Sequence, residues 1–209
     1  STRMIGLPWI QTVGAATGKI VALTSPNESE KKFNWMRVVR HEFVHVLTLQ
    51  KTNFNIPHWF TEAISVTEEN IEMPVDWQLL LLKRFDKETL FNLSNLNNGF
   101  QKPEGPDDWT LAYCQSFLYA QHLQNEFGEE ALRKLLDAYQ TTSSTEVAFQ
   151  KAFSASLDDF EEEYQKFIER KVRSVRHGRK PDRLSIEAAQ QLVNNSPEDA
   201  AAHAQFAFA

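Results

Sequence analysis

The residues best suited to chemistry lie at positions 41–45, where the sequence reads HEFVH. Apolar residues recur at helical spacing through residues 34–51, which predicts a helix there. His41 and His45 then lie on one face of that helix, one turn apart, and their imidazoles can bind one metal ion. Glu42 can take a proton from a water at the fourth coordination position. This HExxH pattern predicts a metal-dependent hydrolase, against the alternative of a His–Glu cluster on the surface of an ordinary helix.

Glu62 follows His45 by seventeen residues and falls near the start of a second predicted helix, at residues 58–66. Two antiparallel helices joined by a turn can bring this glutamate opposite the two histidines. Two imidazoles and one carboxylate, with a fourth position left for water, are the protein ligands of a catalytic zinc site. A structural site would close that position, typically with cysteine, and Cys114 is the single cysteine. We therefore expect one Zn²⁺, although the same ligands accept other first-row ions.

The scaffold of this site is predicted to be α+β and mostly helical. Residues 19–24, β-branched and apolar, are predicted to form a strand, with residues 11–17 as its partner. Because two strands are not stable alone, we expect either further strands upstream of this chain or a helix that covers them. A polar loop at residues 92–108 is long enough to suggest a functional role. Further helices are predicted at residues 76–85, 109–127, 129–139, 145–153 and 156–172.

The helix at residues 34–51 is predicted to begin at Asn34, which suits the N-cap position. Its apolar residues are predicted to form a stripe that faces the core. The stripe consists of Trp35, Val38, Val39, Phe43, Val46, Leu47 and Leu49. His41 and His45 lie beside the stripe, as expected for ligands at the wall of a cleft.

The composition argues against several classes of function. A chain of 209 residues with 42% hydrophobic content can bury one substantial core and a small appendage. A net charge of −6 argues against nucleic acid or an anionic membrane as the main partner, because both bind basic surfaces. The strongest apolar run, at residues 79–82, is far shorter than the roughly 20 residues of a membrane span. No signal peptide is visible.

The two motif segments together resemble a known family. HEFVH followed by PHWFTEA at residues 57–63 is similar to the HExxH…PxWFxEG pattern of gluzincin zinc metallopeptidases, and most similar to the bacterial peptidase MA-like group. This resemblance implies a zincin-like fold, a metallopeptidase activity, and His41, His45 and Glu62 as the ligands of one zinc ion. Trp59 and Phe60 are expected to be core anchors that fix the helix of Glu62.

The resemblance extends over residues 10–170. Residues 14–18 and 24–26 resemble the strand region before the motif helix, and AYCQSF at residues 112–117 resembles a later helix with an AYxQS-type stretch. One position departs from the pattern, because Ala63 stands where glycine usually follows the glutamate. Alanine favours the helix but adds a methyl group where close packing is expected, which puts the clearance for substrate in question.

The chemistry gives each candidate residue a role. Glu42 is predicted to be the general base and then the proton donor to the leaving amine. The oxyanion of a tetrahedral intermediate needs a hydrogen-bond donor, which gluzincins commonly take from a later helix. Tyr113 is the candidate by its place in the AYxQS-like stretch, with a packing tyrosine as the alternative and Tyr119 as its rival. His58 and His122 are expected at the surface or the rim of the core, with His58 close enough to contact substrate.

The C-terminal part is predicted to be separate from the catalytic domain at residues 1–172. Residues 173–183 are basic and read as a solvated linker or, alternatively, a docking segment. Residues 184–209 resemble one tetratricopeptide-type helical hairpin. Because a lone repeat cannot bury its own face, we expect further repeats or docking onto the catalytic domain, and a protein partner is possible through such repeats.

The prediction that combines these features is zinc-dependent hydrolysis of peptide bonds in a peptide or protein substrate. The edge strand within residues 13–24 is expected to pair with an extended substrate. An alternative is a zincin-fold scaffold of weak or no activity that acts with helical repeats as a protein-binding module. The family resemblance slightly favours an extracytoplasmic or periplasmic location in bacteria.

Overall fold

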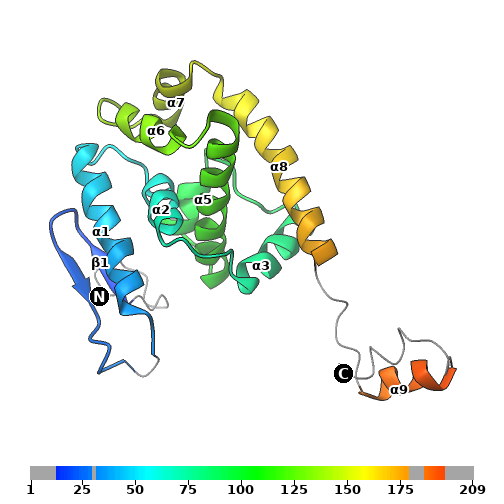
Figure 1. Cartoon of the computed structure of the whole chain (residues 1–209). Coiled ribbons are helices and arrows are strands. Elements are labelled where there is room, and N and C mark those ends of the chain that lie inside the picture. The colour runs from blue at the N-terminus through cyan, green and yellow to red at the C-terminus, as the bar shows by residue number, and fades with distance from the viewer. Residues whose placement is uncertain (1–12, 30–31, 179–185, 196–209) are drawn as a thin grey trace. The chain divides into compact units, whose positions relative to one another are not determined.

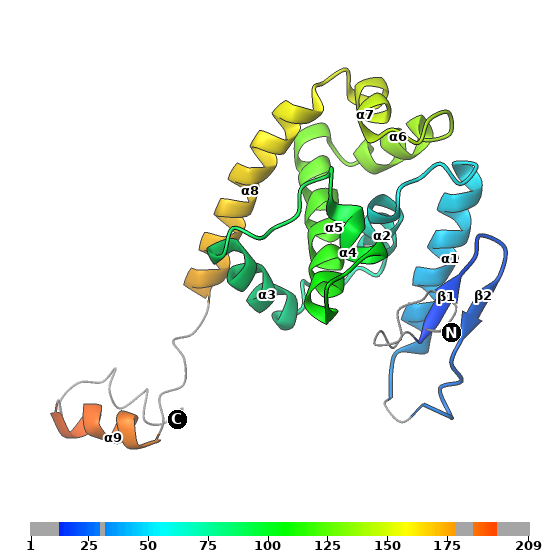
Figure 2. The ribbon, with the colours of Figure 1, turned by 180° about the vertical axis from the view of Figure 1, so that it is seen from behind.

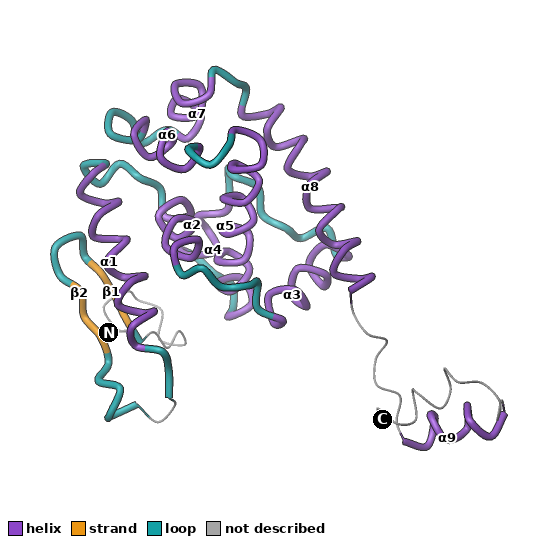
Figure 3. Tube along the Cα trace, viewed as in Figure 1, coloured by secondary structure: helices purple, strands orange, loops and turns teal. Residues whose placement is uncertain are grey.

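In a computed structural model of the chain, the structure describes residues 13–29, 32–178 and 186–195. This part is α+β and mostly helical, with one two-stranded antiparallel sheet, as predicted (Figures 1 and 3). None of its helices is both long and apolar enough to span a membrane. The elements are β1 (Gly14–Ala16), β2 (Val21–Leu23), α1 (Trp35–Lys51), α2 (His58–Glu68), α3 (Val75–Asp86), α4 (Leu96–Gln101), α5 (Pro106–Phe127), α6 (Ala131–Ala138), α7 (Thr145–Phe153), α8 (Leu157–Gly178) and α9 (Ile186–Asn195).

Strands β1 and β2 form the predicted hairpin, in which Gly14 pairs with Leu23. The turn between them is fixed to the C-terminal end of α1. Gly18 has φ of +79°, and a Cβ at this position would lie 2.6 Å from the ring of Phe54. The Gln50 side chain also donates a hydrogen bond of 2.6 Å to the Gly18 carbonyl. The hairpin therefore lies along α1, with β1 beside the helix (Figure 1).

Helix α1 begins as predicted, because the Asn34 side chain accepts a hydrogen bond from the Arg37 amide. The prediction that the apolar stripe of α1 faces the core is wrong for its large residues, which are exposed. Trp35 is 48% exposed, Phe43 53% and Leu47 52%. The buried residues of α1 are instead Glu42, His45 and Thr48. The helix turns a polar face inward because that face packs against the hairpin at Gly14 and against α2 at Thr61.

Helix α5 is the centre of the core, and α2 packs along it (Figure 2). Trp59 and Phe60 on α2 are almost fully buried, which agrees with their expected role as anchors. Ala63 is also fully buried, so its methyl group lies in the core and away from solvent. The helix α5 ends at Gly128, where φ is +83°, as its glycine predicts.

The prediction of a loop at residues 92–108 is wrong, because this segment contains α4 and the start of α5. Leu96 and Phe100 of α4 are buried against the core. The high content of Asn, Gly and Pro concealed this helix, which is only six residues long. Gly99 permits it to approach α5, since a Cβ there would lie 2.7 Å from the Ala112 Cβ.

The chain divides into two compact units, residues 1–168 and 169–209. Helix α8 begins at the predicted place, where the Ser156 hydroxyl accepts a hydrogen bond from the Asp159 amide. It continues to Gly178, so the first part of the predicted linker at residues 173–183 is helical. Helix α9 coincides with the first helix of the predicted hairpin. The second helix, after residue 195, lies outside the described residues.

Candidate metal centre

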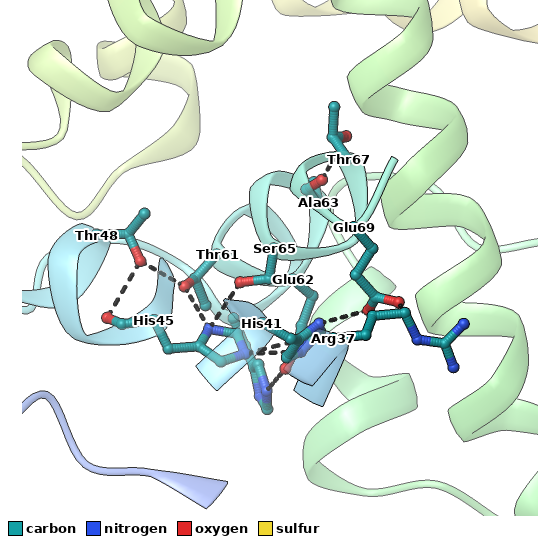
Figure 4. A network of polar contacts seen from close by, with 11 residues as sticks. Arg37, His41, His45, Thr48, Thr61, Glu62, Ala63, Ser65, Thr67 and Glu69 are labelled. Carbon is teal, nitrogen blue, oxygen red and sulfur yellow. Dashed lines mark hydrogen bonds and ion pairs between the residues drawn. The ribbon is translucent and has the colours of Figure 1, made fainter. Parts of the chain in front are cut away.

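Three side chains from α1 and α2 converge on one point (Figure 4). The Nε2 atoms of His41 and His45 are 3.1 Å apart. The Oε2 atom of Glu62 lies 3.2 Å from the first and 3.4 Å from the second. Three ligands of a tetrahedral metal ion, each about 2.0–2.1 Å from it, are separated by about 3.3 Å. The spacing of these atoms therefore matches that of three ligands around one ion.

The Oε2 atom of Glu62 gives an independent reason to place a cation here. The residue is only 4% exposed, and among the described residues Oε2 has no hydrogen-bond partner. Its contacts with the two imidazoles are short but lack hydrogen-bond geometry. This buried oxygen faces the two imidazoles without a hydrogen bond of good geometry, and a metal ion between the three groups would satisfy it. The donor set, two imidazoles and one carboxylate, fits such an ion.

His45 is oriented by a chain of hydroxyl groups behind it. Its Nδ1 lies 2.8 Å from the Thr61 hydroxyl, which is 2.7 Å from the Thr48 hydroxyl. Thr48 in turn donates to the His45 carbonyl at 3.3 Å. If each hydroxyl donates to the next acceptor, Nδ1 carries the proton and the Nε2 lone pair points to the shared site.

His41 is held by a carboxylate on the neighbouring helix. Its Nδ1 lies 2.7 Å from Oε1 of Glu69, at the C-cap of α2, and the Arg37 guanidinium contacts Oε2 of Glu69 at 3.2 Å. Burial alone would lower the pKa of His41, but its contacts with Glu62 and Glu69 raise that pKa to about 10. A metal ion at this position must displace a proton from the imidazole, which is the usual coupling of metal binding to proton release.

The two oxygens of Glu62 face different partners. Oε2 points to the shared site, while Oε1 lies 3.1 Å from Nε2 of His58, one turn earlier on α2. Burial would raise the pKa of Glu62, but the charge of His45 and polar contacts with His41, His45 and His58 hold it well below its usual range. The carboxyl group is thus ionised, as a ligand must be. His58, expected at the surface or the rim of the core, contacts Glu62 directly.

Glu42 lies beside the shared site without joining the triangle of ligand atoms, and only 7% of it is exposed. Strand β1 packs directly on it, because a Cβ at Gly14 would lie 2.6 Å from Oε1 of Glu42. Burial raises the pKa of Glu42, against the charges of His45 and His41, which lower it. A carboxylate with a raised pKa is a stronger proton acceptor than an exposed one. This arrangement suits a general base.

Tyr113 and its rival Tyr119 face different parts of the molecule. The ring centroid of Tyr113 lies 6.4 Å from that of His41. Desolvation and the charges of Glu62 and Glu42 raise the pKa of Tyr113 well above its usual value, so the phenol stays a hydrogen-bond donor. Tyr119 instead donates to Glu161 and stacks on Tyr164 with centroids 3.6 Å apart, which occupies it in packing against α8.

His122, expected at the surface or the rim of the core, is instead buried in the core. It is 3% exposed and stacks between Phe160 and Phe167 of α8, at centroid distances of 4.7 and 5.2 Å. The histidine therefore packs against aromatic rings at a place separate from the ligand triangle.

The chain matches a known protein family over most of its length. A family model described as the Peptidase MA superfamily matches residues 12–170, which include the hairpin and every residue of the candidate site. The chain belongs to the peptidase MA superfamily. The matched range leaves out α9, so membership in the superfamily concerns the part of the chain that carries the HExxH motif.

This superfamily member is similar to the uncharacterized protein YhcO of Bacillus subtilis (strain 168). The two are 25% identical over 142 residues, which cover 65% of this chain and 42% of the relative. The match thus spans less than half the length of the relative. No solved structure matches the chain.

In this peptidase MA superfamily member, the α2 residues that hold the two histidines in place were not identified from the sequence. Thr61, Ser65 and Glu69 recur every four residues and therefore share one face of α2. The Ser65 hydroxyl lies 3.3 Å from Nδ1 of His45, so all three contact a histidine of α1. Three polar residues at helical spacing were the available signal, because buried polar side chains need partners.

Proposed function

We propose that the protein is a zinc-dependent peptidase of the gluzincin type, with a zincin-like fold, in which His41, His45 and Glu62 bind one Zn²⁺. The observation that carries this proposal is the triangle of ligand atoms 3.1–3.4 Å apart with the buried Oε2 of Glu62 at one corner. Membership in the peptidase MA superfamily supports peptides or proteins as substrates. Zinc, when bound, acidifies a water and polarises the scissile carbonyl.

The chain's own residues carry the proton transfers. Glu42 takes the proton of the attacking water and later delivers it to the leaving amine, which becomes a neutral product. Its buried position beside β1 keeps bulk water from competing for that proton. Tyr113, held as a neutral phenol, donates a hydrogen bond to the oxyanion of the tetrahedral intermediate.

Strand β1 is the element proposed to align the substrate. It pairs with β2 along one edge and contacts Glu42 through Gly14. An extended peptide paired with β1 would present its carbonyls next to Glu42, with register set by the main chain. A complex with a substrate analogue that lacks main-chain contacts to β1 would contradict this alignment.

The experiment that tests the function compares zinc-loaded and chelated protein. We expect the zinc-loaded chain to cleave members of a mixed peptide library, 1,10-phenanthroline to abolish the cleavage, and added zinc to restore it. Mass spectrometry of the products measures all three. Full zinc occupancy without cleavage of any peptide would overturn the proposed activity and favour a binding scaffold built on the same fold.

A second prediction concerns Glu69, which supports a ligand without binding the metal. Glu69→Ala is expected to weaken zinc binding by about 10- to 100-fold, because His41 loses the carboxylate that fixes its orientation. Competition with a chromophoric chelator measures the affinity. Glu68→Ala is the matched control, since Glu68 is a neighbouring, exposed carboxylate paired with Arg40. Equal zinc affinities of the two variants would contradict the role of Glu69.

A further inference from the structure

We propose that Trp77, Trp109 and Tyr113 form an aromatic subsite for the substrate residue next to the scissile bond, and that preferred substrates carry a large apolar, above all aromatic, side chain there. This inference rests on the proposed peptidase function and names its substrate class. None of the three residues belongs to the ligand triangle.

The geometry of the rings places this subsite beside the metal-binding residues. Tyr113 lies against His41 on one side, with centroids 6.4 Å apart. On its other sides it contacts Trp109 at 5.7 Å and Trp77 at 6.4 Å. These three side chains are half-buried rather than enclosed. Each therefore keeps part of its surface accessible to a ligand.

A buried ring forms the base of this aromatic group. Phe100 of α4 is 2% exposed and contacts Tyr113 at 5.2 Å, Trp109 at 5.6 Å and His58 at 4.5 Å. It reaches Tyr113 and Trp109 because α4 approaches α5 closely at Gly99 (Figure 2), and it reaches His58 because α4 also packs against α2. His58 in turn contacts the ligand Glu62. The aromatic group and the metal-binding residues are thus connected through direct contacts, which fixes their separation.

The acidic side chains next to Trp109 are neutralised by cations, which favours an apolar occupant over a charged one at this end of the group. The two carboxylates that precede Trp109 on α5 are both paired with cations of α3. Asp107 contacts Lys83 at 2.9 Å, and Asp108 contacts Arg84 at 2.7 Å. A charged substrate side chain would compete with these ion pairs. An aromatic side chain gains offset or edge-to-face contacts with the rings.

The test measures cleavage of a peptide series by the zinc-loaded full chain, with Phe, Leu, Ala or Asp on either side of the cleaved bond. We expect kcat/KM to be at least about tenfold higher for Phe than for Ala at one of these positions, and lowest for Asp. Trp109→Ala is expected to remove most of the preference for Phe over Ala, while Trp109→Phe keeps it. Trp77→Ala provides a second variant on another helix.

Phe153→Ala is the matched control, because it also truncates an aromatic side chain. Phe153 stacks on Phe127 with centroids 4.1 Å apart. Phe127 lies eighteen residues after Trp109 on α5, which is about 27 Å along the helix. This variant is expected to keep the preference for Phe. Thermal unfolding of all variants shows which of them are folded.

A binding measurement separates this inference from the proposed function. N-acetyl-tryptophan amide is expected to bind the chain at least about tenfold more tightly than N-acetyl-alanine amide, as measured by ligand-observed NMR, and Trp109→Ala to remove the difference. Binding of this kind without cleavage of any peptide would support the subsite and overturn the peptidase. Peptide cleavage without preference for Phe, unchanged in Trp109→Ala, would overturn the subsite and leave the peptidase standing.

Discussion

Replacement of Glu42 with glutamine is expected to lower kcat for peptide hydrolysis by about 10²- to 10⁴-fold and to leave the zinc content unchanged. Glutamine keeps the shape of the side chain, so the close contact with Gly14 is preserved. It cannot accept a proton, and the attacking water therefore loses its base. Because Glu42 stands outside the triangle of ligand atoms, the metal is retained. Steady-state kinetics and metal analysis of the same preparation measure both effects.

The matched control for this variant is Glu68→Gln, which neutralises an exposed carboxylate of the neighbouring helix. It is expected to keep the kcat of the unmodified chain. An equal kcat for Glu42→Gln and Glu68→Gln would contradict the role of Glu42. Loss of zinc from Glu42→Gln would show that this residue acts as a ligand and not as the base.

Replacement of His45 with alanine is expected to abolish both zinc retention and peptide cleavage. Only His41 and Glu62 would remain as ligands, and the hydroxyls of Thr61 and Thr48 would lose the imidazole that they orient. In the unmodified chain, zinc at about 1,000 times its Kd is expected to stabilise the fold by about 4 kcal/mol. Thermal unfolding with and without zinc should show this stabilisation, and His45→Ala should lack it.

His177→Ala is the control for the loss of a histidine, because His177 is exposed on α8 and bonds only to the Arg173 carbonyl among the described contacts. It is expected to bind zinc and to be stabilised by it. Circular dichroism checks that His45→Ala keeps its helices. A folded His45→Ala that still binds zinc with unchanged affinity would exclude His45 as a ligand.

The core of the candidate site was predictable because it depends on short-range geometry. Two histidines four residues apart share a helix face whatever the rest of the fold, and Glu62 needs only one turn and one more helix to reach them. The supporting contacts were not predictable in the same way. Glu69 and His41 are 28 residues apart in the sequence, and their contact depends on how α1 packs on α2.

The prediction of which face of α1 is buried failed for a related reason. Helical periodicity identifies a face but not the neighbour that it meets, and the usual assumption is that the most apolar face is buried. Here the buried face contains Glu42, His45 and Thr48, while Phe43 and Leu47 are exposed. The polar side chains of α1 that form the candidate metal centre face inward, so the rule fails at the site itself.

The choice between Tyr113 and Tyr119 also required the structure. Both are tyrosines of α5, six residues apart, so they point in different directions from one helix. The sequence does not state which direction faces α1. Tyr119 contacts Glu161 and Tyr164 of α8, whereas Tyr113 lies near His41.

The most direct test of the central claim is anomalous diffraction at the zinc absorption edge from crystals grown with zinc. We expect one peak, about 2.0–2.2 Å from Nε2 of His41, Nε2 of His45 and a carboxylate oxygen of Glu62. The peak should lie near Glu42 without being bound by it. Absence of a peak between these three side chains, or a peak held by other residues, would contradict the claim.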